Sequence, residues 1–190
     1  FIERFMAEYL VMGLAIMTLV AGFTMLGVYF AGKQKSRVTL YFGVISIIWF
    51  VLTMHFWLPG YWFMSWRMQD NLFYILVGVI VVLIYMLLEL ILGYRFRVAR
   101  TVIFVLFFIQ AVLAITATVE SPITGWRFDI MGPIGVLCQL MWGYVIVRGI
   151  RDGNVEAKII MTGYLVFLLT LVHDALMMNR LIMSDNFMIN

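Results

Sequence analysis

Long apolar runs alternate with short polar segments along the whole chain. Each run is long enough to cross a hydrocarbon core of roughly 30 Å, because a helix rises about 1.5 Å per residue. The six runs are residues 9–32, 38–58, 71–94, 101–119, 130–147 and 159–179. They are too long and too continuous for the alternating strands of a membrane barrel, and helices satisfy their own backbone hydrogen bonds in lipid. The pattern predicts an all-α fold, a polytopic transmembrane helical bundle.

The composition supports the same class of protein. Hydrophobic residues make up 65% of the chain and charged residues 12%, which is outside the range of ordinary soluble domains. The polar linkers are short, and the chain contains no low-complexity segment and no internal repeat. We therefore expect residues 1–190 to form a single transmembrane domain that is surrounded by the lipid bilayer as its partner.

The basic residues predict the orientation of this bundle. Nine of the 13 Lys and Arg residues lie in the three alternate connections after the first, third and fifth runs. They are Lys33, Lys35, Arg37, Arg95, Arg97, Arg100, Arg148, Arg151 and Lys158. By the positive-inside rule these connections face the cytoplasm and the N-terminus lies outside. The net charge of +3 thus reflects orientation, and we expect no nucleic-acid partner.

Only a few polar side chains are predicted inside the membrane. Glu89 lies six residues before Arg95, so we interpret it as an interfacial carboxylate close to Arg95 and Arg97. Gln110 and Gln139 fall near the centres of consecutive runs, where an amide needs a partner. We expect these two amides to bond to each other as packing contacts, and the alternative is that they line a small ligand cavity. No charge lies near the middle of the bilayer, which disfavours a proton or ion path.

The outer layer contains His55 on the second run and the adjacent pair His173 and Asp174 on the last. Neighbours on a helix point about 100° apart, so the pair must contact different elements. A carboxylate at this depth is costly unless it is paired. We hypothesise that Asp174 locks the sixth span to its neighbours, using His55, Arg67 or Arg127, and that a stimulus redistributes this contact. The alternative is a static packing role.

Cofactor and catalytic chemistry find little support in the sequence. No lysine lies within a span to carry a retinal Schiff base. His55 and His173 are the only histidines, so a haem between them, or a metal site with Asp174, is a weaker alternative. We find no nucleophile beside a base and no phosphate-binding loop. We expect neither a cofactor nor a bound metal, and no enzymatic activity in these residues.

Two segments contain recognisable motifs. In residues 162–182, Gly163 opens the span and the pair His173 and Asp174 closes it, and in residues 33–49 a basic turn leads into Tyr41-Phe42-Gly43. These segments resemble the penultimate span and the second span of the bacterial seven-transmembrane receptors with diverse intracellular signalling modules (7TMR-DISM). The resemblance covers most of residues 10–190 and implies a seventh span after residue 190.

The resemblance implies a sensor that relays an extracytoplasmic stimulus to a cytoplasmic output domain. Both the sensing domain and the signalling domain would belong to the same polypeptide, and the output domain could be enzymatic. The implied location is the bacterial inner membrane. Two alternatives stay open: a transporter or channel subunit that uses Glu89 and the pair His173 and Asp174, and a structural subunit of a larger complex. A homodimer is also left open.

Overall fold

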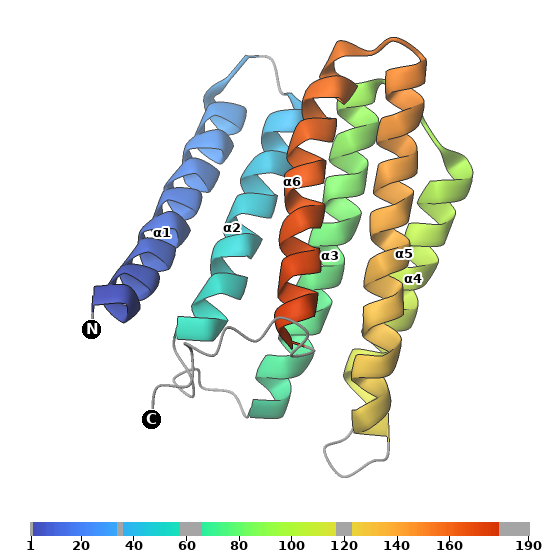
Figure 1. Ribbon diagram of the computed structural model, residues 1–190. Helices are drawn as coiled ribbons and strands as arrows, with labels where there is room; N and C mark the ends of the chain where they lie inside the picture. Colours follow the sequence, from blue (N-terminus) through green and yellow to red (C-terminus); the bar gives the residue numbers. More distant parts are fainter. Residues whose placement is uncertain (1, 34–35, 58–65, 117–122, 179–190) are drawn as a thin grey trace. The chain divides into compact units, whose positions relative to one another are not determined.

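The computed structural model describes residues 2–33, 36–57, 66–116 and 123–178, and these residues form six α-helices and no strand (Figure 1). The helices are α1 (Ile2–Ala31), α2 (Arg37–Trp57), α3 (Trp66–Leu92), α4 (Arg97–Thr116), α5 (Ile123–Arg151) and α6 (Val155–Met178). The all-α fold predicted from the sequence is confirmed.

Five of the helices contain a segment that is long and apolar enough to cross a membrane. These segments are Met12–Ala31, Arg37–Met54, Asn71–Leu92, Arg97–Thr116 and Pro133–Arg151. Several helices extend beyond the apolar run, because a helix can continue past the hydrocarbon core into the polar interface. The sixth predicted span falls in α6, where most side chains after Val166 lie outside the described residues. Its membrane crossing stays a prediction.

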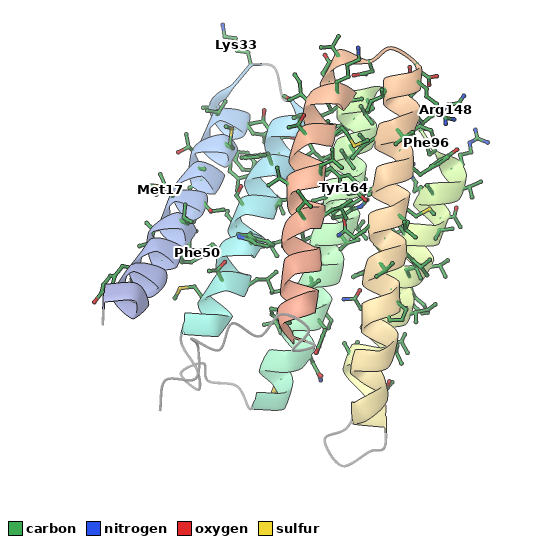
Figure 2. The ribbon with its side chains drawn as sticks, in the orientation of Figure 1. Met17, Lys33, Phe50, Phe96, Arg148 and Tyr164 are labelled. Carbon is green, nitrogen blue, oxygen red and sulfur yellow. The ribbon has the colours of Figure 1, made fainter. Side chains whose placement is uncertain are left out.

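The chain divides into two compact units, Phe1–Trp142 and Gly143–Asn190. In the first unit α1 packs on α2, α2 on α3, and α3 on α4. The connection between α1 and α2 and the connection between α3 and α4 lie at the same end of this unit (Figure 1). Lys33 projects from this end, and Phe96 lies toward it (Figure 2). We call it the basic end.

Small residues allow α1 and α2 to approach closely. Gly22, Gly43 and Ser46 are buried between the two helices. A Cβ atom added at Gly22 would lie 3.1 Å from the carbonyl oxygen of Gly43, and one added at Gly43 would lie 3.1 Å from the carbonyl oxygen of Gly22. Membrane helices associate through such small residues because lipid supplies no hydrophobic driving force between them.

The packing of α4 on α3 uses one stripe of α4. Its buried residues recur at helical spacing and are Ala99, Ile103, Gln110 and Ala114. On α3, Gly78 permits close contact, since a Cβ atom there would lie 2.7 Å from the ring of Phe107. Other large apolar side chains, such as Phe108 at 69% exposure, point away from the protein, as expected for a surface covered by lipid.

The second unit contains the tight turn between α5 and α6. Gly153 has a φ of 81°, and the Asn154 N–H donates to the carbonyl of Gly149 at 3.0 Å. This is the pattern in which a glycine in left-handed conformation ends a helix. The Asn154 side chain then accepts the Ala157 N–H at 3.0 Å and caps the start of α6.

Candidate functional site

A cluster of polar groups fastens the end of α3 to the start of α4. Glu89 is buried, with 5% of its surface exposed. Its Oε2 atom accepts a hydrogen bond from Arg100 Nε at 3.0 Å and forms an ion pair with Nη2 of the same guanidinium. Its Oε1 atom accepts the Phe96 N–H at 2.9 Å and lies 3.1 Å from the Tyr85 hydroxyl. Both oxygens of this buried carboxylate are therefore satisfied.

Tyr85 completes this arrangement, which we call the α3–α4 clamp (Tyr85, Glu89, Phe96 and Arg100). Tyr85 lies one helical turn before Glu89 and is fully buried. Its hydroxyl also lies 3.1 Å from the carbonyl oxygen of Phe96, so its single proton has two acceptors. The connection turns at Gly93, whose φ of 72° suits the end of a helix. Phe96 is thus held through both of its backbone polar groups.

A pocket of about 190 Å³ lies beside the clamp at the basic end. It is lined by Arg37, Tyr41, Met86, Glu89, Leu90, Arg95 and Arg100, and we call it the arginine pocket. The three arginines come from the start of α2, the connection between α3 and α4, and α4. Among the residues that the structure describes, Arg37 and Arg95 form no ion pair. The pocket therefore carries more positive than negative charge.

The interpretation of Glu89 needs one correction. The basic connection does lie next to it, since Arg95 lines the same pocket, but its ion-pair partner is Arg100. Arg100 is in the first turn of α4, and the packing of α4 on α3 carries this turn over Glu89. The sequence reasoning did not find Tyr85 as a partner. The four-residue spacing of Tyr85 and Glu89 places them on one helix face, and this spacing could have predicted their contact.

The predicted bond between Gln110 and Gln139 is wrong for the Gln110 amide. Its Nε2 atom donates to the backbone carbonyl of Tyr74 on α3, at 2.7 Å. Gly78 explains why this carbonyl is accessible, since it lies one turn further along α3 and has no side chain. A Cβ atom at Gly78 would lie 3.3 Å from Cδ of Gln110. The amide thus fastens α4 to α3 at a second point, eight residues after the start of α3 and six residues before the end of α4.

We expect Gln110→Leu to lower the free energy of unfolding by about 0.6 to 1.7 kcal/mol, the range for interhelical hydrogen bonds in membranes. Because the amide bonds to Tyr74, its effect and that of Gln139→Leu should add. The measurement is reversible unfolding in bicelles of both single variants and the double variant. A coupling energy above about 0.5 kcal/mol would restore the original pairing.

The outer-layer candidates are only partly described. His55 lies in α2, and His173 and Asp174 lie in α6, but their side chains fall outside the described residues. The described side chains contain no group of three or more His, Cys, Asp or Glu residues that could hold a metal. Because neither histidine is among those side chains, the haem and metal alternatives and the proposed contact of Asp174 stay untested.

Comparisons with protein-family models, with curated proteins and with solved structures found no match to this chain. The resemblance to the 7TMR-DISM receptors therefore depends on residues 33–49 and 162–182 themselves.

Proposed function

We propose that this chain is a transmembrane signal-transducing module that relays an extracytoplasmic stimulus to a cytoplasmic output domain. Its basic end faces the cytoplasm and its N-terminus lies outside, in the bacterial inner membrane. Support comes from the concentration of Lys and Arg in alternate connections and from the two segments that resemble 7TMR-DISM receptors.

The placement of buried polar groups is the observation that carries this proposal. Among the described residues, the buried polar or charged side chains are Ser46, Glu89 and Gln110, and the buried Tyr85 and Cys138 add a hydroxyl and a thiol. Glu89 is the one buried Asp, Glu, Lys, Arg or His among them. Glu89 lies three residues before the end of α3, where Arg100 and Phe96 close off its oxygens. A proton or ion path needs ionisable or hydrated groups through the middle of the membrane. This distribution favours a module that acts by moving helices over one that conducts ions.

The α3–α4 clamp gives a physical basis for such movement. If the connection between two helices were flexible, a displacement of one helix would change the conformation of the connection and would not move the other helix. Here Glu89 and Arg100 join the two helices, and Tyr85 and Phe96 fix the connection between them. A tilt of α3 or α4 would therefore move the residues of the basic end by a similar amount. The output domain would respond to that movement. Hinge and shear movements of packed helices are a common form of switching.

The hypothesis for Asp174 provides a test of the sensor function. In the full-length protein in native membranes, Asp174→Asn preserves the size of the side chain and much of its hydrogen bonding. We expect changed basal or stimulated output with an unchanged thermal midpoint, because a redistributed contact alters signalling and leaves the packing intact. Unchanged output at unchanged stability would remove Asp174 from the mechanism.

Reconstitution separates the sensor from the transporter alternative. The full-length protein in liposomes, loaded with a pH-sensitive dye and placed under an imposed proton gradient, should leak no faster than protein-free liposomes. Potassium and sodium gradients should give the same result. A protein-dependent flux that Glu89→Gln abolishes would instead support the transporter or channel function.

A further inference from the structure

We propose that the arginine pocket binds the phosphate group of an anionic phospholipid. The first reason is charge. Three arginines and one carboxylate line the pocket, and the carboxylate of Glu89 is paired with Arg100. Arg37 and Arg95 can therefore bind an anion together. Arg37 belongs to α2, and Arg95 belongs to the connection between α3 and α4. Guanidinium groups match phosphate oxygens with paired hydrogen bonds.

The second reason is the order of polar and apolar groups in the lining. Met86 and Leu90 lie one turn apart on the same face of α3, before the helix ends at Leu92. Arg95 follows in the connection and Arg37 begins α2, so both belong to the rim. A phosphate held by these arginines would have apolar wall on its membrane side. A phospholipid has this same order of groups, with its phosphate at the interface and its acyl chains below.

The third reason is size. The volume of about 190 Å³ is smaller than the roughly 300 Å³ at which pockets begin to enclose a whole small-molecule ligand. The pocket therefore takes only one part of its ligand, the phosphate with the adjoining glycerol. The acyl chains stay in the bilayer beside the exposed Leu90. A free phosphate shares the anionic chemistry and would leave Met86 and Leu90 without a role.

Occupation of the pocket would bridge α2 to the α3–α4 clamp. Arg37 and Tyr41 belong to α2, whereas Glu89 and Arg100 belong to the clamp. A bound phosphate would make these parts respond together to the composition of the inner leaflet. Basic pockets between membrane helices on the cytoplasmic side are suited to such headgroups. Binding at this pocket does not require the proposed signalling function, but it does require the basic end to face the cytoplasm.

Lipid titration with matched arginine variants tests the site. The full-length protein, purified in neutral detergent, is titrated with phosphatidylglycerol, and bound lipid is counted by native mass spectrometry. Each of Arg37→Gln and Arg95→Gln should weaken binding about fivefold, and the double variant about 25-fold, from the typical contribution of a basic residue to anionic-lipid binding. Arg97→Gln is the control, because Arg97 lies in the same basic region but does not line the pocket.

Three further results decide the interpretation. Arg37→Lys preserves the charge and should recover part of the binding that Arg37→Gln loses, which separates loss of the site from misfolding. If inorganic phosphate displaces phosphatidylglycerol at equal concentration, the pocket is an anion site whose ligand is a soluble phosphate, and the phospholipid is ruled out. An equal loss of binding in Arg97→Gln and in the double variant would overturn the proposal. The lipid would then be attracted by the total charge of the basic end and not by the pocket.

Discussion

Replacing Arg100 by glutamine is expected to lower the free energy of unfolding by about 2 kcal/mol, because it leaves the buried Glu89 carboxylate without its cation. Removing one partner of a fully buried pair costs about 3 to 5 kcal/mol. The Arg100 side chain is 39% exposed and Glu89 only 4%, so solvent screening reduces that figure. The Phe96 N–H continues to hold the carboxylate and reduces the loss further.

The reverse substitution should be milder. In Glu89→Gln the half-exposed guanidinium of Arg100 can turn toward water, so we expect a loss of about 1 kcal/mol. The double variant should lose less than the two single variants together, since no charge is then left buried. Arg97→Gln, which touches neither the clamp nor the pocket, should stay within about 0.5 kcal/mol of wild type. Reversible unfolding in bicelles gives all four values, and strictly additive losses would mean that the two side chains do not interact.

Gly43→Leu should separate α1 from α2 and cost about 1 to 3 kcal/mol, the usual effect of overpacking a tight contact. Even the first added atom meets Leu26 Cδ2 at 2.9 Å and the carbonyl oxygen of Gly22 at 3.1 Å. The leucine side chain can move, but the backbone oxygen can move only if the helices separate.

Gly27→Leu is the matched control on α1, since nothing lies within 4 Å of a Cβ atom at that position. Leucine favours helix over glycine by about 0.8 kcal/mol, so this variant should be neutral or more stable. Unfolding of the two variants in bicelles should thus show a lower stability for Gly43→Leu and no loss of stability for Gly27→Leu. A similar change in both would show that the contact of Gly22 with Gly43 does not hold the helices together.

The apolar runs predicted the helices well and their ends less well. The run 38–58 agrees with α2 within one residue, but α5 begins at Ile123, seven residues before its predicted run. Hydropathy identifies the part of a helix that favours hydrocarbon. The polar turns at its ends, such as residues 66–70 of α3, remain helical because their backbone bonds do not depend on the lipid.

The clamp could be predicted only in part, because a sequence gives depth along a helix but not the partner across it. The predicted proximity of Glu89 to the basic connection was correct, and three arginines were within reach. The choice of Arg100 depends on how α4 crosses α3. The error for Gln110 has the same origin, since its partner is a backbone carbonyl made accessible by Gly78, and no side-chain pattern reports such an acceptor.

The proposed signalling function and the phosphate site both require the basic end to face the cytoplasm. Single cysteines can be placed in a Cys138→Ala background at Ser36, in a basic connection, at Glu156, in the first turn of α6, and at Ser184, after α6. Intact cells are then exposed to an impermeant thiol reagent. Ser36→Cys and Glu156→Cys should be labelled only after the membrane is permeabilised, whereas Ser184→Cys should react at once. Labelling of Ser36→Cys in intact cells, with Ser184→Cys protected, would contradict the orientation and both proposals with it.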